Sequence, residues 1–122
     1  MTWRKRPRVL LAEDHEEVAK AVCRVLALDC DVVGSVPDGS AVLEAAQRLQ
    51  PDMIVLDLDL PNVNGLEACR RIMQVNPDAK IIVFTAMNDP DLRQQCLDVG
   101  ASAFLAKGDG DLVSTIKRLC AD

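Results

Sequence analysis

Residues 53–65 read MIVLDLDLPNVNG. The first four positions are apolar and come shortly after Pro51, so we expect a short buried strand over residues 53–56. The strand is followed at once by the carboxylate of Asp57, and then by a loop whose second half, residues 61–65, is rich in turn-forming residues. A buried strand that ends on a polar loop is typical of the parallel sheets of α/β proteins.

Similar apolar runs lie on both sides of this segment. Residues 9–12 and 81–84 are rich in β-branched or large aliphatic side chains, and residues 31–36 and 103–106 are two weaker candidates. The segments between these runs have apolar positions at helical spacing. Strand and helix therefore alternate five times, which predicts a single α/β domain. Its core is a doubly wound, five-stranded parallel sheet with helices on both faces.

The five expected helices also have recognisable ends. Prolines close the second and third helices. The fourth begins at Asn88 or Asp89 with Pro90 in its first turn, and Gly100 suits the left-handed position after its last turn. The apolar positions that mark the other four helices are, in chain order, Val18, Val22 and Val25; Val42, Ala45, Ala46 and Leu49; Leu66, Cys69, Ile72 and Met73; and Leu112, Val113, Ile116 and Leu119.

Length and charge narrow the class of protein. A chain of 122 residues and 13.3 kDa is sized for one domain, which we expect to span residues 1–122. The net charge of -5 argues against a nucleic-acid surface, and the apolar run at residues 9–12 is too short for a membrane span. Five scattered cysteines without metal-ligand spacing predict free thiols and a cytoplasmic location. We expect neither a nucleic-acid nor a membrane partner.

Chemically active side chains follow or end four of the five predicted strands. Glu13 and Asp14 follow the first strand, Asp57 follows the third, Thr85 ends the fourth, and Lys107 follows the fifth. In an open parallel sheet, ligands bind at the carboxyl ends of the strands. We therefore expect these five side chains to converge in one cleft.

The expected cleft has the composition of a phosphoryl-transfer site. Several carboxylates close together are stable in ionised form only if a cation lies among them. With oxygen ligands and neither histidine nor cysteine expected among them, the favoured cation is Mg²⁺, which commonly recruits a phosphate oxygen. An aspartate can itself act as the nucleophile and form an aspartyl phosphate. Asp57 is our candidate for that nucleophile, with Lys107 neutralising charge and Thr85 donating a hydrogen bond to a phosphoryl oxygen.

The order of these residues along the chain resembles the receiver domains of two-component response regulators. Residues 57–65, DLDLPNVNG, are similar to the D-x-x-x-P-x-x-x-G loop of that family. The resemblance covers nearly the whole chain and implies the flavodoxin-like strand order 2-1-3-4-5. It also implies that Asp57 is the phosphoacceptor, Asp14 a direct Mg²⁺ ligand, Glu13 a ligand acting through water, and the backbone carbonyl of Asp59 a further ligand.

The resemblance further implies a switch. Thr85 and Lys107 would bind the phosphoryl oxygens, and Thr85 with Phe104 would remodel the face formed by the fourth helix, fifth strand and fifth helix. Phe104 has no hydroxyl, which excludes a mechanism based on a tyrosine hydroxyl. Gly108 after the lysine and His15 after the acid pair are similar to the subfamily that usually carries a C-terminal helix-turn-helix domain. We expect His15 to be a loop or helix-start residue rather than a catalytic base or a phosphate carrier.

The function implied by the resemblance is that of a signalling module. The phosphoryl donor would be the phosphohistidine of a sensor histidine kinase or of a phosphotransfer protein, and the output would be a changed interaction surface. A phosphorylation-dependent homodimer is compatible with that output. Such a chain is no enzyme beyond its own phosphorylation and dephosphorylation.

Two other classes stay open on the sequence alone. Asp57-Leu58-Asp59 resembles the D-x-D of haloacid-dehalogenase-type phosphatases, although in those enzymes the motif lies on the first strand and the remaining acids come later. Turnover of a phosphomonoester would identify that class. The third class is a receiver-like interaction module that binds partners without phosphorylation, and a phosphorylation assay separates it from the first.

Overall fold

Strands and helices alternate five times in the computed structural model, which describes residues 6–108 and 111–120. The strands are β1 (Arg8–Ala12), β2 (Asp31–Val36), β3 (Met53–Leu56), β4 (Ile81–Thr85) and β5 (Ala103–Ala106). The helices are α1 (Glu16–Leu26), α2 (Gly39–Leu49), α3 (Gly65–Val75), α4 (Pro90–Asp98) and α5 (Leu112–Cys120). Among the described residues, no helix has the length and apolar character of a membrane span.

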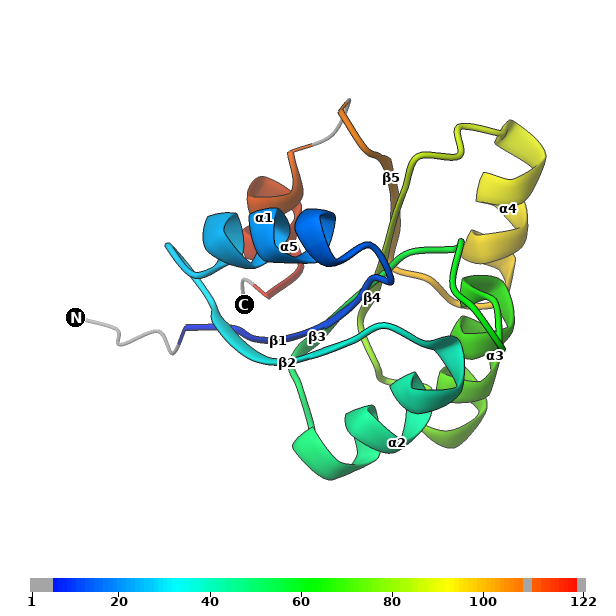
Figure 1. Ribbon diagram of the computed structural model, residues 1–122. Coiled ribbons are helices and arrows are strands. Elements are labelled where there is room, and N and C mark those ends of the chain that lie inside the picture. The colour runs from blue at the N-terminus through cyan, green and yellow to red at the C-terminus, as the bar shows by residue number, and fades with distance from the viewer. Residues whose placement is uncertain (1–5, 109–110, 121–122) are drawn as a thin grey trace.

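The five strands form one parallel sheet in the order β2-β1-β3-β4-β5 (Figure 1). This order confirms the predicted fold. In the central pair, Ala12 of β1 lies opposite Leu56 of β3, so the residues after these two strands emerge side by side. In the pair formed by β4 and the edge strand β5, Thr85 of β4 lies opposite Ala106 of β5. The register therefore gathers the four strand ends that carry the predicted site.

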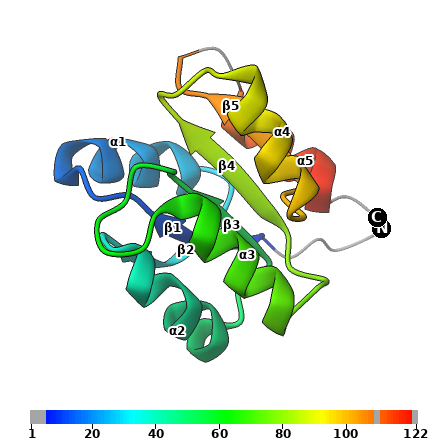
Figure 2. The ribbon, with the colours of Figure 1, turned by 90° about the vertical axis from the view of Figure 1, so that its right-hand side faces the viewer.

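Helices cover both faces of the sheet. Helices α1 and α5 lie on one face, and α2, α3 and α4 lie on the other (Figures 1 and 2). Alternate side chains of each central strand enter one of two apolar clusters, because successive residues of a strand point to opposite faces. Leu10 and Ile54 pack under α2 and α3, whereas Leu11 and Val55 pack under α1 and α5. Strands buried on both faces explain the uninterrupted apolar runs in the sequence.

Most predicted boundaries agree with the structure to within one residue. Strand β1 begins at Arg8, one residue before the predicted apolar run, and β4 continues through Thr85, the residue predicted to end it. Asp89, rather than Asn88, caps α4, since its side chain accepts a hydrogen bond from the backbone N–H of Asp91. Gly100 has a φ of +113°, as expected for the left-handed position after that helix.

The apolar positions that marked α1 do not all lie on its buried face. Val25 is 51% exposed, although it shares a face of α1 with Val18 and Val22. The face of α1 that packs on the sheet is instead formed by Ala19, Val22, Cys23 and Leu26. The three valines form a stripe that is rotated from this face, since only Val22 belongs to both sets.

Candidate functional site

The predicted site residues meet at the carboxyl edge of the sheet. Glu13 continues directly from β1 and Asp57 directly from β3, and these strands are neighbours. Both acids are almost completely buried, with 3% and 5% of their surfaces exposed. Lys107 follows β5 and reaches across the end of β4 to both of them. The strand order thus brings together side chains that are far apart in the sequence.

Lys107 connects the two buried acids. Its Nζ lies 2.9 Å from Oδ2 of Asp57 and also donates a hydrogen bond to Oε1 of Glu13. The backbone N–H of Lys107 donates to the carbonyl oxygen of Thr85 at 2.7 Å, which fixes the base of the side chain at the sheet edge. Its ammonium also lies 5.9 Å from the centre of the Phe84 ring, within the range of a cation–π contact.

These contacts keep Asp57 ionised despite its burial. Burial by itself raises the pKa of this carboxyl, but the hydrogen bonds from Lys107 and from the backbone N–H of Asp59 outweigh it and lower the pKa below its ordinary value. For Lys107, burial lowers the pKa, while the hydrogen bonds to Glu13 and Asp57 raise it above its ordinary value. Both groups therefore carry their charges at neutral pH, so Asp57 is available as a carboxylate nucleophile.

The loop after β3 positions the second oxygen of Asp57. The backbone N–H of Asp59 lies 3.2 Å from Oδ1 of Asp57, while the Asp59 side chain is exposed. Behind the loop, the backbone N–H of Gly65 donates to the carbonyl of Leu58 at 3.0 Å. A methyl group at Gly65 would overlap with the carbonyl oxygen of Asp57, so only glycine permits this approach of α3 to the loop.

The acid cluster also contains a histidine that the sequence interpretation did not expect there. His15 occupies the N-cap position of α1 without a capping hydrogen bond from its side chain, and its Nδ1 lies 3.1 Å from both Glu13 Oε2 and Asp14 Oδ1. Its pKa is raised, first by the hydrogen bond with Glu13 and then by the charge of Asp14. The expectation that no histidine lies near the ligands was wrong. Its position directly after the acid pair was the available signal.

The cluster fits a divalent cation. Glu13, Asp14, His15 and Asp57 each offer one ligand atom, and these four atoms all lie within 4.8 Å of one another. Three of the four are carboxylates, which are the oxygen ligands that Mg²⁺ prefers. The imidazole is an addition to that set rather than a replacement for it.

The two predicted switch residues lie on adjacent strands. Thr85 is fully buried, and its hydroxyl oxygen accepts a hydrogen bond from the backbone N–H of Met87 at 3.2 Å. Phe104 is 8% exposed and lies opposite Val83 in the β4–β5 register. Its ring packs in the cluster under α2, α3 and α4. Its side chain is therefore already buried in this conformation.

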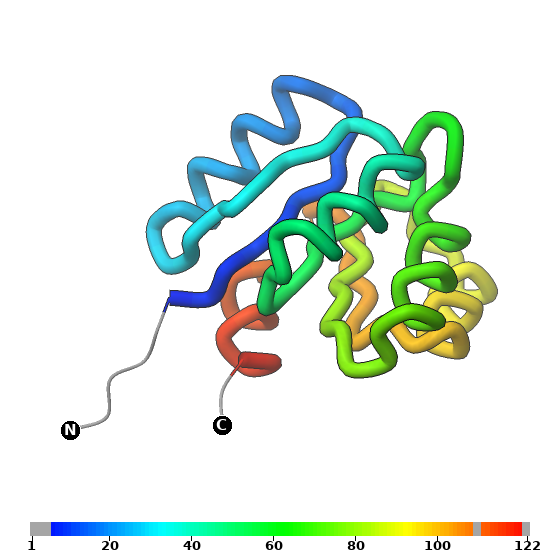
Figure 3. The backbone as a smooth tube through the Cα atoms, turned by 90° about the horizontal axis from the view of Figure 1, so that it is seen from below, coloured from blue at the N-terminus to red at the C-terminus, as the bar shows by residue number. Residues whose placement is uncertain are grey.

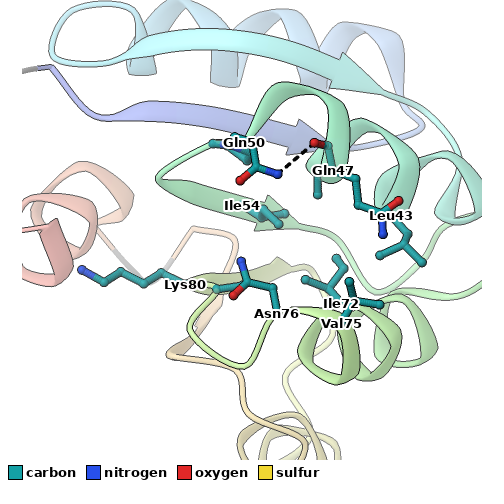
Figure 4. Close-up of a pocket in the computed structure, with 11 residues that line it drawn as sticks. Leu43, Gln47, Gln50, Ile54, Ile72, Val75, Asn76 and Lys80 are labelled. Carbon is teal, nitrogen blue, oxygen red and sulfur yellow. Dashed lines mark hydrogen bonds between the residues drawn. The ribbon is translucent and has the colours of Figure 1, made fainter.

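A separate cavity of about 310 Å³ lies between α2 and α3 (Figure 4). It is bounded by residues that precede β3 and β4, such as Pro51 and Lys80, so it lies at the opposite end of the sheet from the acids. The Gln50 amide donates to the Gln47 carbonyl, and the Lys80 ammonium donates to the Leu119 carbonyl. The cavity therefore contributes nothing to the acidic site.

Comparison with known proteins supports the same class. The family model of the response regulator receiver domain matches residues 9–117. Response regulator GacA of Pseudomonas viridiflava is 34% identical over 119 residues, which cover 93% of this chain and 55% of GacA. Transcriptional regulatory protein LiaR of Bacillus subtilis (strain 168) is 37% identical over 102 residues, which cover 82% of this chain and 48% of LiaR. The chain spans about half the length of these curated relatives.

Solved structures agree with these sequence matches. A two-component response regulator of the LuxR family from Aurantimonas sp. SI85-9A1 superposes with a TM-score of 0.90 at 28% identity, covering 94% of this chain and 85% of that one. The signal receiver domain of the putative response regulator NarL from Mycobacterium tuberculosis gives a TM-score of 0.89 at 27% identity, covering 95% and 97%.

The chain belongs to the response regulator receiver domain family. It is a receiver with a phosphoacceptor role in two-component signalling. Receiver domains generally bind Mg²⁺ at an acidic pocket, and the acid cluster of this chain matches that feature. These matches do not favour the phosphatase or the unphosphorylated module. The position of Asp57 also argues against the phosphatase, since it follows the third strand rather than the first.

Proposed function

We propose that Asp57 is the residue that accepts the phosphoryl group. The observation that carries this proposal is a buried carboxylate that stays ionised because Lys107 and the backbone N–H of Asp59 bind its two oxygens. An oxygen of Asp57 attacks phosphorus, the bond from phosphorus to the donor's imidazole nitrogen breaks, and the bonding electrons leave with that nitrogen. The donor class is a phosphohistidine on a sensor kinase or a phosphotransfer protein.

The neighbouring residues have distinct tasks in this proposal. Mg²⁺ would be held by Asp14, Asp57, the backbone carbonyl of Asp59 and, through water, Glu13. It would neutralise negative charge on the transferring group. Lys107 binds a phosphoryl oxygen once its contact with Asp57 is exchanged for one with the phosphate. The buried hydroxyl of Thr85 is the second donor.

The output is a change of surface at α4, β5 and α5. Thr85 and Phe104 lie on neighbouring strands of that region, so a movement of the Thr85 hydroxyl toward a phosphoryl oxygen is transmitted through the β4–β5 pair. The 122 residues act as one receiver module in the cytoplasm, where a reducing environment suits the buried thiols of Cys69 and Cys96. Self-association of the phosphorylated form is one way to read the changed surface.

The test is phosphorylation by acetyl phosphate, followed by intact-mass analysis with and without Mg²⁺. We expect the wild-type chain to gain one phosphoryl group only with Mg²⁺, and Asp57→Asn to gain none. Asp78→Asn is the matched control, because it also replaces an aspartate by its amide, at an exposed position after α3, and leaves the site intact. Phosphate uptake by Asp57→Asn, or undiminished uptake in excess chelator, would contradict the assignment.

A further inference from the structure

The loop that carries Asp57 and Asp59 is in contact with a second element besides α3. Helix α2 begins beside the tip of this loop, where the chain passes from Pro61 to Val63 (Figure 3). The backbone N–H of Gly39 donates to the carbonyl oxygen of Pro61 at 3.2 Å. A methyl group at Gly39 would overlap with the carbonyl oxygen of Val63, so the two backbones are in direct contact.

Side chains reinforce this contact. Asp38 caps α2, because its Oδ1 accepts hydrogen bonds from the backbone N–H and from the hydroxyl of Ser40. Its other oxygen, Oδ2, accepts a hydrogen bond from Nδ2 of Asn62. Asn62 has a φ of +68°, a left-handed conformation that Asn tolerates better than most residues. One carboxylate thus joins the start of α2 to the tip of the loop.

The segment between this contact and the proposed metal ligand is short and stiff. Only Leu60 and Pro61 separate Asp59 from Asn62. Leu60 is 7% exposed and packs in the apolar core, and the ring of Pro61 restricts its own φ. The Pro61 carbonyl also accepts from the Val63 N–H at 2.8 Å. A displacement at Asn62 is therefore transmitted to Asp59, whose N–H binds Asp57 and whose carbonyl is a proposed ligand.

We propose that the Asp38–Asn62 pair is a positioning device that holds the phosphoacceptor loop in the geometry that binds Mg²⁺ and accepts phosphate. Neither residue touches the reacting atoms. This inference rests on the proposed function of Asp57, because the loop matters only if it carries the acceptor and a metal ligand. The loop then has three stabilising contacts: Asp38 with Asn62, Lys107 with Asp57, and the Gly65 N–H with the Leu58 carbonyl.

Two substitutions separate the loop contact from helix capping. Asn62→Gly removes the amide and keeps the left-handed φ accessible, and Asp38→Ser keeps a capping oxygen but cannot serve both partners. We expect each to weaken Mg²⁺ binding by about fivefold, in line with the loss of one charge-assisted hydrogen bond at an exposed site, measured by calorimetry. The double variant should lose no more than either single variant. Ser40→Ala, which leaves the Asn62 bond intact, should bind Mg²⁺ as the wild type does.

An exchanged pair provides the rescue. Asp38→Asn with Asn62→Asp keeps the net charge, a capping oxygen and an amide–carboxylate hydrogen bond, so its Mg²⁺ affinity should lie within about twofold of wild type. Single variants with wild-type affinity, or a double variant that loses the sum of both single losses, would overturn the proposal.

Amide hydrogen exchange in the metal-free protein tests the loop independently of phosphorylation. The hydrogen-bonded amides of Asp59 and Val63 should exchange faster in Asn62→Gly, and at the wild-type rate in Ser40→Ala and in the exchanged pair. Equal exchange in Asn62→Gly and the wild type contradicts the positioning role. Failure of the wild-type chain to bind Mg²⁺ or to take up phosphate contradicts instead the proposed function of Asp57.

Discussion

The ammonium nitrogen of Lys107 lies 2.9 Å from Oδ2 of Asp57, although 50 residues separate them in the chain. The same nitrogen binds Glu13, so the two most buried acids of the cleft share one ammonium. An incoming phosphoryl group brings its own negative charge to this place. The Lys107–Asp57 pair is therefore the contact that phosphorylation must rearrange.

Lys107→Ala should impair signalling far more than Lys117→Ala. Removal of a donor that binds charge in the transition state typically costs about a hundredfold in rate, so we expect slower phosphate uptake, a lost phosphate-dependent self-association, or both. Lys117 is the matched control, because its ammonium forms a surface ion pair with Asp29 at 3.3 Å and its side chain is 61% exposed. Exposed ion pairs of this kind contribute little to protein stability. Equal behaviour of the two variants in both assays would remove Lys107 from the site.

Asp59 should influence how long the phosphoryl group survives. Its exposed side chain belongs to the residue whose N–H binds Asp57, so it can orient a water for attack, whereas its charge would repel an incoming hydroxide. Because Mg²⁺ and Lys107 reduce the charge effect, we expect Asp59→Ala to lengthen the lifetime, and Asp59→Asn to change it less.

Dephosphorylation of the three proteins at fixed Mg²⁺ measures this effect. A shorter lifetime for Asp59→Ala would mean that repulsion dominates. Unchanged lifetimes would leave Asp59 contributing only its backbone carbonyl.

Acid should destabilise the metal-free wild type more than Asp57→Asn. The pKa of Asp57 is lowered in the folded chain, so its contribution to stability is fully present above the ordinary value of 3.8 and is lost as the pH falls through the folded value. Urea unfolding at about pH 5 and about pH 3 should therefore show a larger loss of unfolding free energy for wild type. An equal loss in the variant would show that Asp57 has the same pKa in the folded and unfolded chains.

Cys69 and Cys96 should resist alkylation in the native protein. Both are fully buried, and burial raises the pKa of Cys69 to about 11, which leaves roughly one thiol in a thousand ionised at pH 8. Iodoacetamide should label both only in urea, as measured by peptide mass analysis. The partly exposed Cys23 is the internal comparison. Labelling of native Cys69 as fast as Cys23 would mean that the core opens readily.

The sequence by itself determined the class of fold and the residues at the strand ends. Apolar runs of strand length and apolar positions at helical spacing are local properties of a sequence. Both faces of β3 are buried, so residues 53–56 are all apolar and could be predicted as a strand without knowledge of the neighbouring strands. The alternation of such segments implies a parallel sheet, and a parallel sheet places all carboxyl ends at one edge. Asp57 and Lys107 were therefore predictable members of one cleft, although their roles stay predictions.

Only the tertiary structure decided which of those residues touch. The double contact of Lys107, the imidazole of His15 between two acids, and the bond from Asp38 to Asn62 all depend on loop paths and side-chain rotamers. The exposure of Val25 depends in the same way on how α1 is rotated against the sheet. Periodicity is set by neighbours within a few residues, whereas these contacts are set by the packing of segments up to 94 residues apart, which no local pattern encodes.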